Sequence, residues 1–511
     1  MKQTAPLKLP HSPSHGEKFE VAIESLSLEG LGQGSVRAVV GPQEEPKHYT
    51  FEVRKAVPGD RVIAEVRSRK KRTVTARISE MLEASKMRTE PRCRHFGQRG
   101  IPGKGCGGCA LQSMSYRHQL ANKERTIKKL MQARGVDPGL VMPIIGQDEP
   151  WYYRNKMEFS FGDTAEREFA LGLYPKGYRY EIVKLDECFL QSEFVSELLP
   201  RVRKWAKARG LEPYQHNSGF LRTLTIREGK RTGQRMVELT TSDDDRAVMH
   251  GEEVPASEVA DAFCEFVLDA SRELGAELTS VYWTQQRAQR GEPTRFFEHD
   301  LFGEPLLVEK MHLPGDQELS FEIHPRAFFQ PNTLQAEVLY AQVLEKTGLL
   351  EQTEEADSGR RTSRVLDLYC GTGTIGLCMA PYAEKVVGIE MQPDAVDNAR
   401  QNARLNGIDN ISFFTGDVAK VLDQEDFRAE AGQVDLVVVD PPRAGLHAQA
   451  REHLEAIDAP RLVYVSCNPK ALARDLAQLA DFGYAIEVIQ PVDMFPHTYH
   501  VENVALLVKN S

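Results

Sequence analysis

The sequence predicts a protein of several domains whose C-terminal part is an α/β domain with a parallel β-sheet. With 511 residues, the chain is too long to enclose a single hydrophobic core. After Arg364, near-continuous apolar strands such as VLDLYC, VVGIE, VDLVVVD and RLVYVS alternate with helical segments, which is typical of a parallel sheet covered on both faces. Residues 17–78 instead form short alternating strands separated by turn signals, which predicts a small barrel of the OB type.

The composition is that of an ordinary globular protein, with 41% hydrophobic and 27% charged residues. The net charge of −10 argues against a wholly basic nucleic-acid binder. The N-terminal residues lack the apolar core of a secretory signal, and no apolar run approaches the roughly 20 residues needed to span a bilayer. We therefore expect a cytoplasmic protein without a membrane partner, whose eight cysteines serve metal binding or catalysis and not disulfides.

Changes in sequence character divide the chain into four predicted regions. They are a flexible tail (1–16), the OB-like barrel (17–82), a cysteine-bearing loop with a central β-rich domain (83–325), and the α/β domain (326–511). Helices are expected at 115–135, near 256–274 and at 393–406, and the polar segment 350–363 is expected to be flexible.

Positive charge is concentrated in the predicted barrel. Ten Lys or Arg residues lie between Lys47 and Arg77, against three acidic residues. Because these residues belong to a compact β-module, we interpret them as contacts to an RNA backbone, the alternative being a solvated hairpin tip. Arg154 and Lys156 are further candidates for holding RNA, with a plain surface role as the alternative.

A cofactor site is predicted where the α/β domain begins. In VLDLYCGTGTIG (365–376), Gly371 and Gly373 let the backbone approach a ligand closely at the carboxyl edge of the sheet. Glu390 ends the next strand, where a carboxylate can bind ribose hydroxyls. The pattern resembles that of Rossmann-like S-adenosylmethionine methyltransferases, in which the position of Asp417 commonly contacts adenine. The alternative is a structural turn beside a surface acid.

Cys467 follows the apolar strand RLVYVS and is the predicted nucleophile. It lies at the same sheet edge as the DPPRAG loop, which begins at Asp440 and leaves the sheet because proline cannot continue a central strand. Methylation of nitrogen needs no thiol, whereas a thiolate that adds to carbon 6 of a pyrimidine makes carbon 5 nucleophilic. We expect the site to lower the thiol pKa from its usual value of about 8.5.

The covalent adduct must afterwards lose its carbon-5 proton to a base. Glu502 begins the terminal strand of the sequence, and if this strand runs antiparallel to its neighbours, Glu502 lies beside Cys467. His497 and His500 are alternative bases, each also suited to a hydrogen-bonding role in the loop.

The motifs SCNP, DPPRAG and DMFPHTYHVENVALL closely resemble those of the RNA uracil-C5-methyltransferase family, especially its bacterial 23S ribosomal RNA branch. The resemblance covers nearly the whole chain. It implies an α/β Rossmann-like methyltransferase domain with an N-terminal OB-like β-barrel (TRAM) and a central β-rich domain. It also implies that Cys467 is the nucleophile and Glu502 the base. The positions that match cofactor-binding residues of the family are Gln330, Tyr369, Thr374 (often Asn in the family), Glu390 and Asp440.

Four further cysteines suit metal ligation: Cys93, Cys106, Cys109 and Cys188. The C-x-x-C pair lies in a glycine-rich loop, and its spacing is compatible with zinc or with a [4Fe–4S] cluster. The family resemblance favours a structural [4Fe–4S] cluster, although twelve residues separate Cys93 from Cys106 where the ribosomal branch has five. Packing roles are expected for the remaining thiols of Cys264, Cys370 and Cys378.

The predicted function is methyl transfer from S-adenosylmethionine to carbon 5 of a uridine in RNA, most specifically 23S rRNA, by a monomer. A transfer-RNA uridine methyltransferase is the first alternative, and a cytosine-C5 enzyme fits less well. A non-catalytic RNA-binding assembly factor is the alternative from another class of protein. The target base must leave its stack to reach Cys467.

Overall fold

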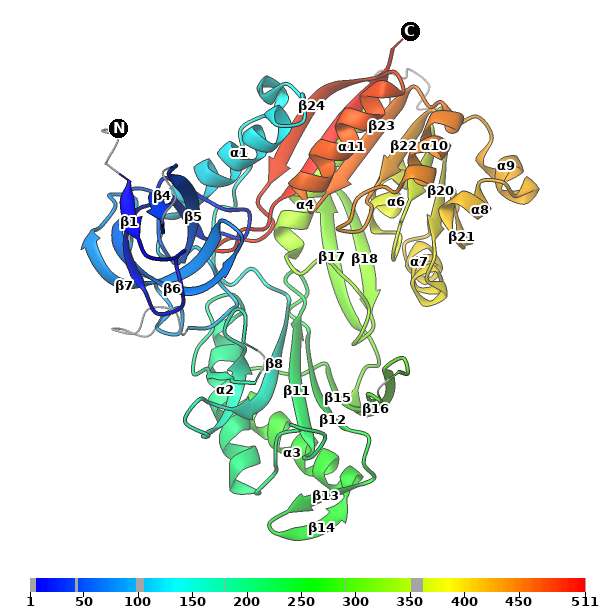
Figure 1. Ribbon diagram of the computed structural model, residues 1–511. Helices are drawn as coiled ribbons and strands as arrows, with labels where there is room; N and C mark the ends of the chain where they lie inside the picture. Colours follow the sequence, from blue (N-terminus) through cyan, green and yellow to red (C-terminus); the bar gives the residue numbers. More distant parts are fainter. Residues whose placement is uncertain are drawn as a thin grey trace. The chain divides into compact units, whose positions relative to one another are not determined.

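The computed structural model describes residues 6–41, 45–97, 105–178, 180–289, 291–350 and 362–510 (Figure 1). The expected flexible segment 350–363 falls almost entirely outside these ranges. The chain forms two compact units, which are described separately. The first contains Met1–Thr126, Gly162–Phe189 and Phe495–Tyr499, and the second contains Ile127–Phe161, Leu190–Met494 and His500–Ser511.

A seven-stranded sheet dominates the first unit, with its strands in the order β1-β4-β5-β7-β6-β2 and β3 paired with β4. Its strands are β1 (Leu7–Leu9), β2 (Lys18–Ala22), β3 (Ser25–Leu26), β4 (Gly32–Val40), β5 (Lys47–Arg54), β6 (Arg61–Lys70) and β7 (Thr73–Glu83). Side chains alternate between solvent and one core that contains Phe51, Val53, Ala64 and Val66. The alternation seen in the sequence therefore corresponds to one buried face.

The sheet curls because β4 carries glycine where β2 approaches it. A Cβ atom on Gly34 would lie 2.1 Å from the carbonyl oxygen of Ala22. Nearby, the Glu24 N–H donates to the carbonyl of Gln33 at 2.7 Å. Only glycine permits this backbone approach.

The expected flexible tail is wrong in part, because residues 7–9 form strand β1 alongside β4. The Gly41 N–H donates to the carbonyl of Leu9 at 2.9 Å, and the hydroxyls of Ser12 and Tyr49 are 2.9 Å apart. Backbone pairing orders this polar segment without an apolar signal in its sequence.

Two strands and one helix also belong wholly or partly to the first unit. Strands β9 (Phe169–Leu173) and β10 (Val183–Lys184) form an antiparallel pair. Helix α1 (Tyr116–Gln132) begins in this unit and ends in the second, and it confirms the helix expected at 115–135.

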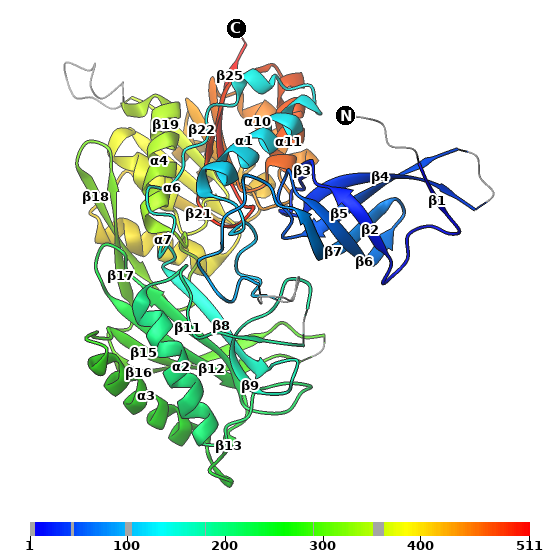
Figure 2. The same ribbon diagram turned by 90° about the vertical axis from the view of Figure 1, so that its left-hand side faces the viewer.

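The central part of the second unit is a sheet of β8 (Lys156–Asp163), β11 (Leu221–Glu228), β12 (Arg235–Ser242), β15 (Ser280–Arg287) and β16 (Arg295–Gly303). Helices α2 (Glu193–Ala208) and α3 (Ala256–Glu273) lie along this sheet, and α3 confirms the helix expected near 256–274 (Figure 2). Trp205 joins them, with its ring 5.5 Å from those of Phe263 and Phe266. Two hairpins complete this part: β13 (Arg246–Met249) with β14 (Glu252–Pro255), and β17 (Leu307–Leu313) with β18 (Gln317–Ile323).

The remainder of the second unit is a seven-stranded sheet in the order β21-β20-β19-β22-β23-β25-β24. Its strands are β19 (Arg364–Leu368), β20 (Lys385–Glu390), β21 (Ile411–Thr415), β22 (Leu436–Val439), β23 (Arg461–Ser466), β24 (Tyr484–Val492) and β25 (Glu502–Lys509). Its helices are α4 (Thr333–Thr347), α6 (Thr374–Met379), α7 (Pro393–Leu405), α8 (Val418–Val421), α9 (Glu425–Ala431), α10 (Ala448–Ile457) and α11 (Pro469–Asp481). The first five strands are parallel, and β25 runs antiparallel to β23.

This arrangement confirms the Rossmann-like α/β fold, and α7 confirms the helix expected at 393–406. The central strands are apolar throughout, as in Leu436–Val439, because helices bury both faces of the sheet. Within the described residues, no helix has the length and hydrophobicity that crossing a membrane requires.

Gly34→Ala tests the closure of the first sheet. We expect the added methyl group to clash with the carbonyl of Ala22 and to destabilise this unit by about 1–3 kcal/mol. Faster hydrogen–deuterium exchange in β2 and β4 would report the loss. Ser35→Ala on the exposed neighbouring position is the matched control, and equal exchange in both variants would contradict the proposed close approach.

Candidate active site

The carboxyl ends of the parallel strands bring the predicted cofactor residues to one edge of the sheet. Leu368 of β19 pairs with Ile389 of β20 and with Val439 of β22. The residues that follow these three positions are therefore neighbours across the sheet: Tyr369, Glu390 and Asp440.

The turn after β19 has a backbone that only a glycine-rich segment adopts readily. Gly371 and Gly373 have φ values of +55° and +75°, and Tyr369 also lies in the left-handed region at φ 62°. A Cβ atom on Gly373 would lie 2.8 Å from the ring of Phe413. The Thr374 hydroxyl, at the start of α6, lies 3.3 Å from that of Thr372.

Glu390 fixes this turn through its carboxylate. One oxygen accepts the N–H of Gly371 at 3.1 Å, and the other accepts the N–H of Gln392 at 2.9 Å. Asp417 follows β21 and begins α8. Burial, and to a smaller extent the charge of Asp417, raises the pKa of Tyr369 to about 12. This electrostatic effect shows that Asp417 lies near the same turn.

The loop after β22 is held in place by α11 and by the residue after Cys467. Leu446 donates its N–H to the buried Asp475 carboxylate at 2.8 Å, and Tyr464 donates its hydroxyl at 2.7 Å. The side-chain amide of Asn468 donates to the carbonyl of Arg443 at 2.8 Å. A polar network therefore determines the path of the DPPRAG loop.

Cys467 and Glu502 are brought together by the pairing of β23 with β25. Ser466 is opposite Asn503, so the next residue on β23 faces the first residue of β25. The Asn503 side-chain amide also donates to the carbonyl of Ser466 at 3.2 Å. The conditional expectation of an antiparallel strand beginning at Glu502 is thereby confirmed.

The expectation that this site lowers the pKa of the Cys467 thiol is wrong when only the protein's own groups surround it. Burial raises the pKa of Cys467 to about 11, and the nearby carboxylates of Glu502 and Asp440 add to this shift. Arg443 acts in the opposite direction through its charge and a hydrogen bond to the thiol. Sequence inspection assigned Arg443 no role, because an arginine after two prolines also fits an exposed loop.

Three acidic side chains of this sheet have raised pKa values. Burial and the charge of Asp440 raise the pKa of Glu502 to about 8. Burial raises the pKa of Asp440 to about 7. Burial, and to a smaller extent the charge of Asp440, raises the pKa of Asp367 to about 8. The surroundings of these side chains therefore disfavour unbalanced negative charge.

Gln330 reaches the same site from the loop that precedes α4. Its side chain hydrogen-bonds Tyr340, a buried residue of α4 whose pKa is raised by burial and by the charges of Cys378, Asp440 and Glu502. The side-chain amide of Asn155 donates to the Gln330 carbonyl at 2.7 Å and to the Thr333 hydroxyl at 2.9 Å. In the sequence, Tyr340 cannot be distinguished from an aromatic residue of the core.

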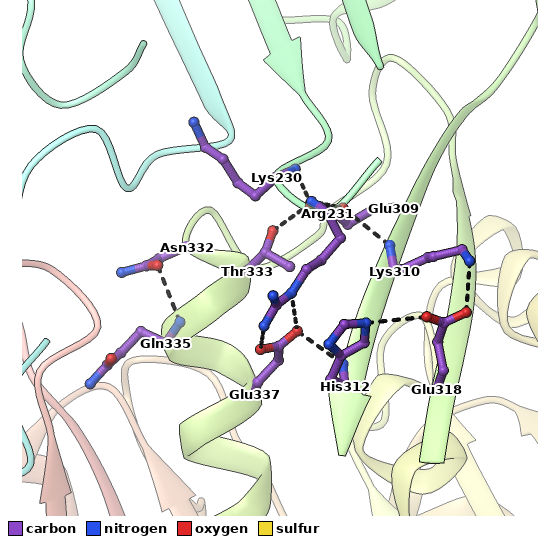
Figure 3. Close-up of polar contacts among 10 residues, drawn as sticks. All are labelled: Lys230, Arg231, Glu309, Lys310, His312, Glu318, Asn332, Thr333, Gln335 and Glu337. Atoms are coloured by element: carbon purple, nitrogen blue, oxygen red, sulfur yellow. Dashed lines mark hydrogen bonds and ion pairs between the residues drawn. The ribbon is translucent and has the colours of Figure 1, made fainter. Parts of the chain in front are cut away.

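The start of α4 is anchored by acidic residues, as Figure 3 shows. Buried Glu309 accepts the Thr333 hydroxyl at 2.8 Å and the N–H groups of Lys230 and Arg231 at 2.6 and 2.9 Å. Arg231 makes two hydrogen bonds to Glu337, at 3.0 and 2.6 Å. These contacts connect the loop that carries Gln330 to the turn between β11 and β12.

The four cysteines considered for metal binding lie in the first unit, where each pair interacts electrostatically. Burial raises the pKa values of all three thiols of the loop, to about 11 for Cys93 and about 12 for Cys106. Backbone N–H groups donate to sulfur at Cys93 and at Cys106, where Gly108 N is 3.4 Å away. In the part of the chain described, no group of three or more His, Cys, Asp or Glu side chains is positioned to hold a metal ion.

The other residues considered from the sequence have varied surroundings. His497 lies in the first unit, where its N–H donates to Gln119 at 3.0 Å and its ring contacts the Gln119 amide at 3.2 Å. Cys264 and Cys378 are buried. Burial lowers the pKa of Lys156 to about 8, and its charge interacts with Arg227 and with acidic residues of the central sheet.

Comparisons with known proteins identify related RNA methyltransferases. Residues 296–510 match a family model described as tRNA (uracil-5-)-methyltransferase. An uncharacterized RNA methyltransferase of Protochlamydia amoebophila is 38% identical over 465 residues, which are 89% of this chain and 99% of that relative. One from Caldanaerobacter subterraneus subsp. tengcongensis is 34% identical over 498 residues, covering 97% of this chain and 99% of that one.

A solved structure shares the architecture over the same extent. The crystal structure of Pyrococcus abyssi tRNA (uracil-54, C5)-methyltransferase in complex with S-adenosyl-L-homocysteine matches with a TM-score of 0.68 and 25% sequence identity. The match covers 96% of this chain and 99% of that one. The chain thus belongs to the RNA uracil-C5-methyltransferase family and is an S-adenosylmethionine-dependent RNA methyltransferase.

Proposed function

We propose that the protein methylates carbon 5 of a uridine in 23S rRNA, with Cys467 as nucleophile and Glu502 as base. The observation that carries this proposal is the register of β23 and β25, which places the thiol and the carboxyl group side by side at the cofactor edge. A vestigial pocket in an RNA-binding assembly factor would not need this pair.

The reaction begins when the Cys467 thiolate forms a bond to carbon 6 of the uracil ring. The electron pair of the carbon 5–carbon 6 double bond then gives an enolate, and carbon 5 attacks the methyl carbon of the cofactor. The bond between methyl and sulfonium sulfur breaks, and its electrons remain on sulfur. Glu502 takes the proton from carbon 5, the double bond re-forms, and the thiolate leaves.

The residues at the sheet edge suit S-adenosylmethionine, which supplies an electrophilic methyl group on positively charged sulfur. Asp440 and Asp367 are buried acids whose pKa values are raised mainly by burial. A cationic ligand balances such charge better than a neutral one. In this proposal Glu390 binds the ribose and Asp417 contacts the adenine of the cofactor. The other cofactor contacts come from Gln330, Tyr369 and Thr374.

The 23S rRNA assignment rests on the first unit. We infer that its curled sheet is a TRAM module, whose basic β6–β7 hairpin includes Arg67, Arg69 and Lys70 and contacts the RNA backbone. We also infer that Cys93, Cys106, Cys109 and Cys188 bind a [4Fe–4S] cluster, as in the ribosomal branch of the family. Buried thiols with N–H donors to sulfur fit thiolate ligands, and four iron atoms spread their ligands more widely than one zinc ion does.

A transfer RNA is the second candidate substrate, because the matching family model and the Pyrococcus abyssi enzyme both carry that substrate in their names. The alternatives predict different modified nucleotides. We expect 5-methyluridine to disappear from one 23S rRNA position when the gene is deleted and to return on complementation. Loss from transfer RNA alone would contradict the ribosomal assignment while leaving the chemistry intact.

Substitution of the reacting pair tests the chemistry. Cys467→Ala should abolish methyl transfer and the trapping of RNA that contains 5-fluorouridine. Glu502→Gln should lower turnover by about 10²–10⁴-fold while the covalent RNA adduct still forms, because only proton removal is impaired. Denaturing gels detect the covalent RNA adduct, and transfer of a radiolabelled methyl group measures turnover. Cys264→Ala is the matched thiol control. Full turnover by Cys467→Ala would exclude the mechanism.

The pH dependence of kcat/KM provides an independent test. Glu502 must be ionised to accept a proton, and its pKa is raised to about 8, so we expect kcat/KM to rise as pH increases through 8. Glu502→Gln should remove the inflection near pH 8 and leave only the rise that follows ionisation of Cys467, whose pKa is about 11. A profile for the wild type that is flat from pH 5.5 to 9 would show that Glu502 is not the base.

A further inference from the structure

Lys55 has a backbone conformation that is unusual for a residue with a side chain. It follows β5 directly and lies in the left-handed region, with φ 57°. A non-glycine residue in this conformation is strained, and such strain is often found at functional sites. The question is therefore what its side chain does.

The surrounding backbone holds Lys55 in this conformation. Arg88 donates to the Lys55 carbonyl at 2.9 Å and makes two hydrogen bonds of 2.8 Å with the fully buried Asp60 carboxylate. Asp60 also accepts the N–H groups of Val57 and Ser85, at 2.6 and 2.9 Å. This network fixes the direction in which the lysine side chain leaves the sheet.

The ammonium group of Lys55 is buried and has no hydrogen-bond partner among the described residues. It lies 4.4 Å from the centre of the Phe96 ring. A Cβ atom on Gly105 would lie 2.5 Å from Lys55 Nζ, so glycine permits the close approach. Burial lowers the pKa of this ammonium group to about 8, and an anionic group beside it would stabilise its charged form.

The groups that face this ammonium are the thiols of the cysteine loop. Cys106, Cys109 and Cys93 all interact electrostatically with Lys55. The adjacent Lys176 differs, because its Nζ donates to the carbonyl of Glu29 at 2.7 Å and lies over the Tyr499 ring at 4.4 Å. Of these two lysines, Lys55 is the one whose ammonium group interacts with the three thiols of the loop and has no hydrogen-bond partner among the described residues.

We propose that Lys55 is the cationic partner of the iron–sulfur cluster and raises its reduction potential, an inference that rests on the cluster assigned under Proposed function. A cluster held by four thiolates is anionic, and reduction adds one negative charge. A fixed cation stabilises the reduced state more than the oxidised one. The same cation offsets the charge of the thiolates in a buried site.

The test compares the full-length wild type with Lys55→Met, Lys55→Arg and Lys176→Met after anaerobic reconstitution with iron and sulfide. Iron content and absorption near 400 nm report loading, and protein-film voltammetry gives the midpoint potential. We expect Lys55→Met to disfavour reduction about tenfold, which is a decrease of about 59 mV for one electron. In Lys55→Arg and Lys176→Met, the equilibrium constant for reduction of the cluster should stay within about threefold of the wild-type value.

Each outcome separates the inference from the cluster assignment. A loaded Lys55→Met protein with the wild-type potential overturns the inference and leaves the cluster in place. Loss of iron from Lys55→Met with retention in Lys55→Arg and Lys176→Met supports a requirement for positive charge, whereas loss from both Lys55 variants overturns it. A wild-type chain that takes up zinc or no metal overturns the cluster, and the inference with it.

Discussion

The antiparallel pairing of β25 with β23 is the constraint on which the active site depends. Strand β23 ends at the sheet edge where β25 begins. Cys467, which follows Ser466, therefore lies next to Glu502, which precedes Asn503. A one-residue shift in this register would move Glu502 to the opposite face of the sheet. Buried hydrogen bonding by Asn503 and continuous apolar packing along both strands hold the register.

Burial raises the pKa of both side chains of the proposed reacting pair, with different consequences for each. It gives Glu502 a pKa of about 8, a value that suits the proposed role of accepting and then releasing a proton. The same burial opposes ionisation of Cys467, where Arg443 supplies compensating positive charge. Proton affinity in this pocket is thus set by the balance between a low dielectric environment and a few fixed charges.

Much of the fold could be predicted from the sequence because its signals are local. Apolar strands alternating with helices identify the α/β domain, and Cys467 and Glu502 follow from motifs next to strand ends. Long-range contacts are not visible in this way. The pairing of residues 7–9 with β4 and the raised pKa of Cys467 both depend on residues far apart in the chain.

The strand order has a consequence for biosynthesis. Strand β25 lies between β23 and β24, although it leaves the ribosome after both of them. Until it emerges, its two neighbours have open edges with unpaired N–H and carbonyl groups, which favour aggregation. Its insertion completes the sheet and in the same step brings Glu502 beside Cys467, so the proposed reacting pair is assembled only when the last strand has been made.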